Sequence, residues 1–226
     1  MKAFIIRKPN DELSEKLSEE CYQSAVQFGI EPYKFDGVYS DHDKLIKEKN
    51  LRFFEKMKDH RKESTGIKGC FLSHFLLWEK CLELNEPIII FEHDALMIRP
   101  LPEHILDLFT HHCVLDYAVH FENYEEIVNT ECQLTVTEFP QIRVDNQKNL
   151  GYSNINKNSV RGSHAHIITP LGAETIINSV RKFGILPSDA CVNRFYTSYI
   201  IVDPLVARCH PFFSNSKNRK QFGHVK

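Results

Sequence analysis

An apolar segment that ends in titratable residues constrains the fold of this chain more than any other feature. Gly66 and Gly69 are expected to form a short loop that leads into a helix over residues 70–84, which is apolar on nearly all sides and therefore buried. Pro87 ends that segment, because proline cannot continue a helix. Residues 88–91, Ile-Ile-Ile-Phe, are too few for a helix and apolar at every position. This pattern predicts a strand buried on both faces of a parallel sheet.

Three titratable residues, Glu92, His93 and Asp94, follow this strand directly. Two carboxylates and an imidazole next to buried residues are unfavourable unless something pairs with them. In open α/β sheets, ligands bind beyond the carboxyl ends of the strands. The sequence therefore predicts an acidic site, able to hold a metal ion, at this edge of the sheet.

The rest of the chain alternates strands and helices, as in α/β nucleotide-binding domains. Thr169 and Pro170 mark a helix start, because threonine caps helices and proline is favoured at the first helical position. A polar segment, residues 141–158, is expected to be a mobile loop suited to acceptor choice. We expect strands over 3–6, 31–35, 95–98, 114–121, 133–139, 162–169 and 200–202, and helices over 11–28, within 41–62, over 103–109, over 170–182 and from 188 onward.

Composition narrows the class of protein. The chain has 226 residues, which fits one sizeable α/β domain, and its net charge of −2 gives no general attraction to nucleic acid or acidic membranes. The tail is the basic exception, and it is read either as a solvated terminus or as a lid over a diphosphate. Its cations are Lys217, Arg219, Lys220 and Lys226.

Cysteine usage and hydropathy predict the compartment. The seven cysteines are scattered and contain no Cys-x-x-Cys pair, which favours reduced thiols in a cytoplasmic protein. The first residues do not read as a signal peptide, and no stretch approaches the roughly 20 apolar residues that a membrane-spanning helix needs. We therefore expect a cytoplasmic protein without a transmembrane segment.

Several motifs resemble glycosyltransferase family 25, whose members build lipopolysaccharide and related glycans. Residues 69–74 read Gly-Cys-x-x-Ser-His, Trp78 follows, and the acidic triplet after the isoleucine-rich strand is Glu-His-Asp where the family usually has Glu-Asp-Asp. Three further segments extend the resemblance over most of the chain. They are Phe35-Asp36-Gly37-Val38, the segment with His166 (where tyrosine is usual) and Gly172-Ala173, and Pro187-Ser188-Asp189.

The resemblance implies a single GT-A-like domain, a Rossmann-type nucleotide-binding fold with a central, mostly parallel sheet flanked by helices. Residues 1–100 would bind nucleotide sugar and metal, residues 101–213 the acceptor, and residues 214–226 form the basic tail. It also implies a metal-dependent inverting transfer, with Mn²⁺ or Mg²⁺ and a nucleotide-sugar donor, most simply a UDP-sugar. The acceptor hydroxyl would belong to a lipopolysaccharide or capsule saccharide, or to a hydroxylated base in phage DNA.

The resemblance also assigns roles to residues. Asp189 is the candidate catalytic base, with Glu92 and His93 as alternatives. Asp94 and Glu92 would bind the metal, and His210 would complete its shell. The candidate donor-binding side chains are Arg7, Lys68, His74 and Glu92. Each role has a structural alternative: Asp189 as a helix cap, His74 as a partner of buried backbone groups, and Lys68 or Arg99 in an ion pair with the carboxylates of the triplet.

Two other functions remain open from the sequence. A metallohydrolase would gather His93, Asp94, His164 and His166 around one or two metal ions, and it would cleave phosphoesters that lack a sugar. A degenerate transferase would bind the donor without turnover, an idea that the altered triplet motivates. The donor sugar, the linkage and the oligomeric state are not determined by these patterns.

Overall fold

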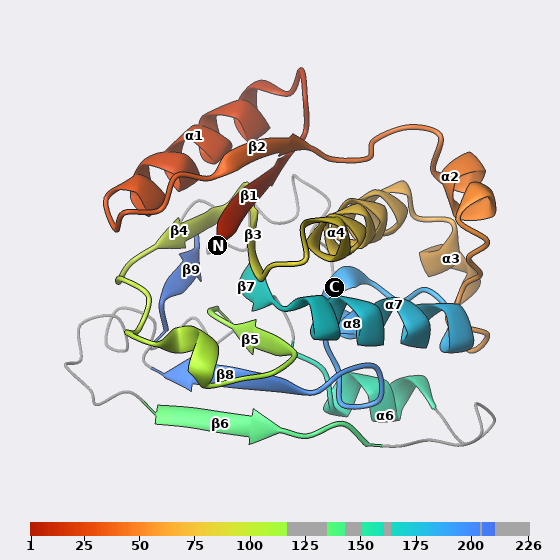
Figure 1. Cartoon of the computed structure of the whole chain (residues 1–226). Helices are drawn as coiled ribbons and strands as arrows, with labels where there is room; N and C mark the ends of the chain where they lie inside the picture. Colours follow the sequence, from red (N-terminus) through yellow and green to blue (C-terminus); the bar gives the residue numbers. More distant parts are fainter. Residues whose placement is uncertain (117–134, 143–150, 161–163, 204, 211–226) are drawn as a thin grey trace.

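A seven-stranded sheet forms the centre of the computed structural model, which describes residues 1–116, 135–142, 151–160, 164–203 and 205–210 (Figure 1). The strand order is β2-β1-β3-β7-β5-β8-β6. Its strands are β1 (Lys2–Arg7), β2 (Tyr33–Asp36), β3 (Ile88–Glu92), β5 (His112–Val114), β6 (Thr135–Phe139), β7 (Ala165–Ile168) and β8 (Tyr199–Asp203). A small second sheet pairs β4 (Ala95–Met97) with β9 (Ala207–Cys209).

The sheet is mostly parallel. Strand β1 pairs in parallel with β2 and β3, and β5 pairs in parallel with β8. Strand β7 is antiparallel to both β3 and β5, and β6 is antiparallel to β8. Strands β2, β1, β3, β5 and β8 therefore run in one direction, and only β7 and β6 oppose them within the described sheet. The predicted α/β class with a central, mostly parallel sheet is confirmed.

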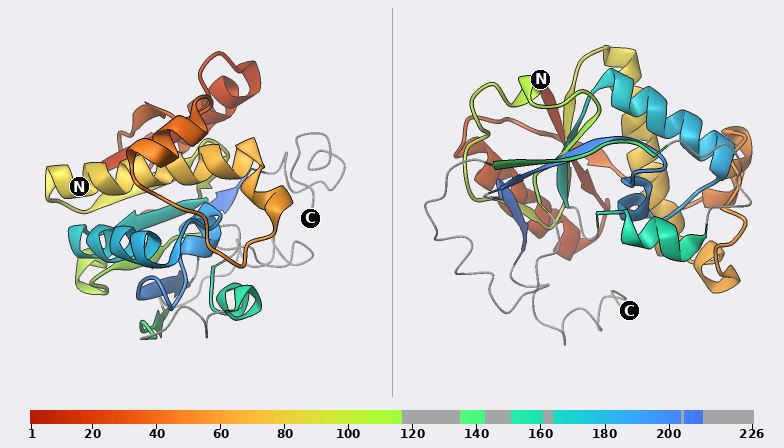
Figure 2. Two further views of the ribbon diagram at one scale, coloured as in Figure 1. Left: turned by 90° about the vertical axis from the view of Figure 1, so that its right-hand side faces the viewer. Right: turned by 90° about the horizontal axis from the view of Figure 1, so that it is seen from below.

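Helices cover both faces of the sheet. Figure 2 shows α4 and α7 side by side over one face and α1 over the other. The helices are α1 (Glu12–Val26), α2 (His42–Glu48), α3 (Asp59–Lys62), α4 (Thr65–Leu84), α6 (Tyr152–Lys157), α7 (Pro170–Phe183) and α8 (Ser188–Cys191), with a 3₁₀ turn at Ile105–Asp107. None of these helices is long and apolar enough to cross a membrane.

Two hydrophobic cores explain why β3 is apolar at every position. Successive side chains of a strand point to opposite faces of the sheet. Ile88 and Ile90 pack into the core beneath α4 and α7, whereas Ile89 and Phe91 pack into the core beneath α1. A strand that is covered on both sides in this way has no solvent-facing position for a polar residue before Glu92.

Helix α4 begins earlier than the sequence indicates. Ser64 caps it through a hydrogen bond from the backbone N–H of Ile67 to Ser64 Oγ, so that Gly66 and Gly69 lie inside the helix rather than in a loop. Tertiary packing overrides the low helix propensity of glycine here. The predicted end is confirmed, because Asn85 adopts a left-handed conformation with φ 49° directly after Leu84.

Three other expectations change. The strand expected over 114–121 is β5, which begins at His112 and ends at Val114, and residues 117–121 lie outside the described part. Within the expected loop 141–158, residues Tyr152–Lys157 form α6, because the fully buried Ile155 anchors that turn in the core. The expected helix over 103–109 is a single 3₁₀ turn. The basic tail and residues 143–150 lie outside the described residues.

Candidate functional site

Polar side chains gather at the carboxyl edge of the sheet. Glu92 ends β3 and Asp94 follows it, and Asp116 follows β5 in the same orientation. His164 precedes β7, which runs antiparallel between these two strands, so its amino end meets their carboxyl ends. The edge that the sequence indicated thus carries three carboxylates and an imidazole.

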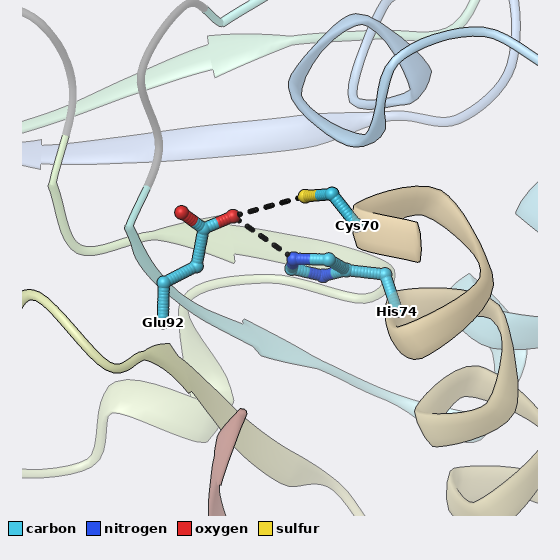
Figure 3. A group of neighbouring side chains, drawn as sticks. All are labelled: Cys70, His74 and Glu92. Carbon is cyan, nitrogen blue, oxygen red and sulfur yellow. Dashed lines mark hydrogen bonds and ion pairs between the residues drawn. The ribbon is translucent and has the colours of Figure 1, made fainter. Parts of the chain in front are cut away.

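One group of side chains at this edge, here called the Cys70 cluster, consists of Cys70, His74 and Glu92. Figure 3 shows Cys70 and His74 pointing from α4 toward the carboxylate of Glu92. The thiol of Cys70 donates to Oε1 of Glu92 at 3.5 Å, and Nε2 of His74 lies 3.2 Å from the same oxygen. The side chain of Glu92 is 28% exposed and that of His74 only 3%.

The electrostatics of the Cys70 cluster fix its protonation. Burial opposes the charged form of Glu92, but the hydrogen bond from His74 and the charges of His164, His74 and His93 outweigh it and lower the Glu92 pKa. Burial and the negative charge of Glu92 raise the pKa of the Cys70 thiol well above its usual range. Glu92 is therefore a carboxylate, and Cys70 without a bound metal is a neutral thiol.

Asp189 lies beside the Cys70 cluster. It belongs to the single turn of α8, where the hydroxyl of Ser188 lies 2.9 Å from Sγ of Cys70. The negative charge of Asp189 contributes to the raised pKa of the Cys70 thiol. Oδ1 of Asp189 accepts a hydrogen bond from the backbone N–H of Ala190 at 2.8 Å, and the side chain is partly exposed. The structure thus brings the candidate base next to the Cys70 cluster.

A second group, here called the Asp94 cluster, consists of Asp94, His164 and Cys209. Their potential ligand atoms all lie within 4.8 Å of one another. The thiol of Cys209 is 3.8 Å from Oδ2 of Asp94, and Nδ1 of His164 is 2.8 Å from Oδ2 of Asp116. Asp94 is only 4% exposed, and its Oδ1 has no hydrogen-bond partner in the part of the chain that the structure describes. A buried carboxylate oxygen in this state needs a partner, such as a water molecule or a cation.

The surroundings of His164 favour positive charge. Burial alone would lower its pKa, but the charge of Asp94 and the hydrogen bond with Asp116 raise it well above the usual range. Burial raises the pKa of Asp116, and the contact with His164 opposes that shift. Because Asp116 holds Nδ1, Nε2 of His164 is the nitrogen available to a metal ion. Carboxylate–histidine pairs of this kind orient metal ligands in proteins.

Three predicted site residues have partners elsewhere. Arg7 bonds to Glu15 at 2.6 Å and to Asp36 at 2.8 Å. Nζ of Lys68 lies 2.6 Å from Asp43, so Lys68 is paired there rather than with the triplet. Nε2 of His210 lies 2.7 Å from Glu20, although the backbone N–H of His210 donates to the carbonyl of Asp94 at 2.6 Å. Donor or metal binding by these three side chains stays a prediction.

The four residues expected to serve a metallohydrolase lie in different parts of the structure. Asp94 and His164 share one cluster. His166 lies instead between His74 and His112, with ring centroids 5.3 Å and 4.7 Å away. Nδ1 of His93 lies 3.3 Å from Oγ of Ser14, on α1. The described residues therefore do not gather these histidines around one centre.

Two residues of the Gly-Cys-x-x-Ser-His motif, Gly69 and Ser73, have structural roles. Oγ of Ser73 accepts from the backbone N–H of Val38 at 2.9 Å and donates to the carbonyl of Gly69 at 2.7 Å. A Cβ at Gly69 would lie 2.5 Å from the carbonyl oxygen of Val38, and one at Gly37 would lie 2.9 Å from Oγ of Ser73. The Asp-Gly-Val segment and the helical motif are thus the two sides of one close contact, which positions Cys70 and His74.

Sequence reasoning missed Asp116 and Cys209. Asp116 follows the buried residues Val114 and Leu115, the same pattern that identified Glu92, but the expected strand over 114–121 ran through it. Cys209 carried no local signal. It reaches the site because β9 pairs with β4, which brings it within 3.8 Å of Asp94.

Comparison with known protein families agrees with these motifs. A family described as "Glycosyltransferase family 25 (LPS biosynthesis protein)" matches residues 7–192. The lipooligosaccharide biosynthesis protein lic2B of Haemophilus influenzae is 49% identical over 39 residues, which are 17% of this chain and 15% of that protein. The CTP:phosphocholine cytidylyltransferase LicC of Streptococcus pneumoniae is similar in structure, with a TM-score of 0.42, 13% sequence identity, and coverage of 99% of this chain and 97% of that one.

Proposed function

The chain belongs to glycosyltransferase family 25, and on this premise we propose that it transfers a sugar, with inversion, from a UDP-sugar to a hydroxyl of a lipopolysaccharide-type saccharide. The observation that carries the proposal is the buried, unpartnered Oδ1 of Asp94 (unpartnered among the described residues), at the carboxyl edge of β3. The family description and the name of the lic2B relative both refer to such glycans, which supports a saccharide acceptor. A DNA base has no comparable support.

The proposed metal site uses Asp94 and His164. Cys209 donates to Oδ2 of Asp94, which leaves Oδ1 for the ion, and Asp116 holds His164 through Nδ1. A carboxylate oxygen with one imidazole nitrogen suits Mn²⁺ better than Mg²⁺, because Mg²⁺ is bound almost wholly by oxygen ligands. A divalent ion in this place would neutralise the charge that develops on the departing diphosphate.

The remaining roles follow from the protonation states. Asp189, partly exposed beside the Cys70 cluster, accepts the proton of the acceptor hydroxyl as that oxygen attacks the anomeric carbon. Glu92, which His74 holds in its carboxylate form, favours the positive charge that develops on the sugar. In these assignments the base lies beside the Cys70 cluster, and the diphosphate site lies at Asp94, two residues after Glu92.

The test is a transfer assay with a panel of nucleotide sugars, lipooligosaccharide acceptors and either Mn²⁺ or Mg²⁺. We expect one donor to support transfer only with metal, and Asp94→Asn to reduce the rate by about 100-fold, equivalent to about 2.7 kcal/mol. Asp107→Asn is the matched control, because the Asp107 side chain is 80% exposed and its ion pair is with His104, outside both clusters. It should retain the wild-type rate.

Other results would point elsewhere. Donor binding without turnover across all acceptors would favour a degenerate binding protein. Hydrolysis of phosphoesters that lack a sugar would favour the metallohydrolase. Transfer to hydroxylated DNA, with affinity that falls steeply with salt, would replace the saccharide acceptor by a DNA base.

A further inference from the structure

The Cys70 cluster has a second capacity, in which Glu92 is a metal ligand instead of the free carboxylate that the proposed transfer uses. We propose that Cys70, His74 and Glu92 bind a Zn²⁺ ion, at a site separate from the Asp94 cluster. The proposal concerns metal binding alone, so it does not rest on the proposed transfer reaction.

The distances within the cluster fit a tetrahedral zinc ion. Zinc binds sulfur at about 2.3 Å and nitrogen or oxygen at about 2.0 Å, so tetrahedral geometry places sulfur and oxygen ligands about 3.5 Å apart and nitrogen and oxygen ligands about 3.3 Å apart. Cys70 Sγ lies 3.5 Å from Glu92 Oε1, and His74 Nε2 lies 3.2 Å from the same atom. The ligand atoms of the three residues all lie within 4.8 Å of one another.

The elements that carry these ligands are rigid. Cys70 and His74 are four residues apart on α4, so they project from the same face of the helix, as paired zinc ligands on helices do. Glu92 comes from β3, whose four preceding residues are buried. Helix α4 is fixed near its start by the contact of Gly69 with Val38. The site is therefore preorganised by packing, before any ion binds.

The donor set selects the metal. Thiolate and imidazole ligands favour zinc over Mg²⁺ or Mn²⁺, which prefer oxygen. On binding, the Zn²⁺–sulfur bond forms and the proton of the Cys70 thiol leaves to solvent. The hydroxyl of Ser188, 2.9 Å from Sγ, can then donate a hydrogen bond to the thiolate. Three protein ligands leave a fourth position for water, which the 28% exposure of Glu92 makes accessible.

Hydrogen bonds alone would give similar distances, so the test must detect a metal–sulfur bond. Purified protein is titrated with Co²⁺, a spectroscopic substitute for Zn²⁺, and competition with Zn²⁺ gives the zinc affinity. We expect Co²⁺ bound at this site to give the intense visible bands of a tetrahedral ion and a sulfur-to-metal charge-transfer band in the near ultraviolet, whether or not a further Co²⁺ occupies the Asp94 cluster. A wild-type spectrum without the sulfur band overturns the proposal.

Cysteine variants locate the ion. Cys70→Ser should abolish the charge-transfer band. Cys209→Ser should keep it, because Cys209 belongs to the Asp94 cluster. Cys81→Ser is the matched control on α4, since its thiol bonds only to backbone carbonyls in the described structure, which serine can also reach. A band that survives Cys70→Ser but disappears in Cys209→Ser places the ion at the Asp94 cluster and overturns the proposal.

A fourth variant tests the site even if Cys70→Ser does not fold. Ser188→Ala leaves all three ligands in place and removes only the hydrogen bond to Sγ. Loss of such an outer partner weakens metal binding by about 10- to 100-fold, so we expect a weaker zinc affinity with an unchanged cobalt spectrum. The assignment is contradicted if Ser188→Ala binds zinc as tightly as the wild type and the charge-transfer band is lost in Cys209→Ser. This conclusion does not need the Cys70→Ser variant.

Discussion

The imidazole rings of His112 and His166 lie 4.7 Å apart between centroids, and both residues are buried in the middle of the sheet. None of their four ring nitrogens has a hydrogen-bond partner among the described residues. Burial, with the neighbouring histidines, lowers the pKa of His112 to about 3 and that of His166 well below its usual range. Both side chains are therefore neutral in the folded protein at physiological pH.

This pair predicts loss of stability in mild acid. Below about pH 6.5 the unfolded chain protonates these histidines while the folded chain does not, so the free energy of unfolding falls by about 1.4 kcal/mol per pH unit for each residue. Urea unfolding at pH 6.5 and pH 5.5 measures this slope. Because the unfolded histidine is only half protonated at pH 6.5, His112→Leu should make the fall in stability over this interval smaller by about 1 kcal/mol. His60→Leu, at an exposed position of α3, should keep the wild-type slope. Equal slopes in all three proteins would contradict the prediction.

The contact between α4 and Val38 predicts opposite effects of two alanine substitutions. Gly69→Ala should destabilise the protein by about 1–3 kcal/mol, because the new Cβ would lie 2.5 Å from a backbone oxygen that cannot rotate away. At Gly66 a Cβ would meet only Oγ of Ser64, at 3.9 Å. Gly66→Ala should therefore stabilise the helix by up to about 1 kcal/mol. Chemical denaturation of both variants is the measurement, and two changes of the same sign would be the contrary result.

These examples show what the sequence could and could not predict. The edge site was predictable because Glu92 and Asp94 follow a strand whose every residue is apolar, and this pattern is local. The role of Cys209 was not predictable, because Cys209 contacts Asp94 only through the pairing of β9 with β4, across 115 residues of sequence. The start of α4 was missed for a similar reason. Glycine suggests a loop by propensity, but Gly69 is required by a tertiary contact that no local pattern reveals.

The hydrogen bond between Asp116 and His164 predicts an effect on metal affinity without loss of a ligand. Asp116→Asn keeps the size of the side chain but weakens the orientation of His164, so we expect Mn²⁺ to bind about 10- to 100-fold more weakly. Titration of Mn²⁺ by calorimetry measures this directly. Asp203→Asn, on the exposed end of β8, should leave the affinity unchanged. Equal Mn²⁺ affinity in wild type and Asp116→Asn would argue against a metal ion on His164.

Asp189 can be tested as a base separately from its structural contact. Asparagine retains an oxygen that can accept the hydrogen bond from the N–H of Ala190, so Asp189→Asn should unfold at the wild-type temperature. It loses the ability to take a proton, and a general base contributes about 10²- to 10⁴-fold, so kcat should fall by that factor while KM for the donor changes little.

Two comparisons make this result specific. Glu174→Gln removes an exposed carboxylate from α7 and should leave kcat unchanged. Asp189→Ala removes both the base and the acceptor for Ala190, so any loss of thermal stability beyond that of Asp189→Asn measures the structural contacts of this side chain, including the hydrogen bond from Ala190. If Asp189→Asn turns over at the wild-type rate, proton transfer belongs to another group. Glu92 is then the carboxylate to replace next, because it lies on the same edge of the sheet and is held in its charged form by His74.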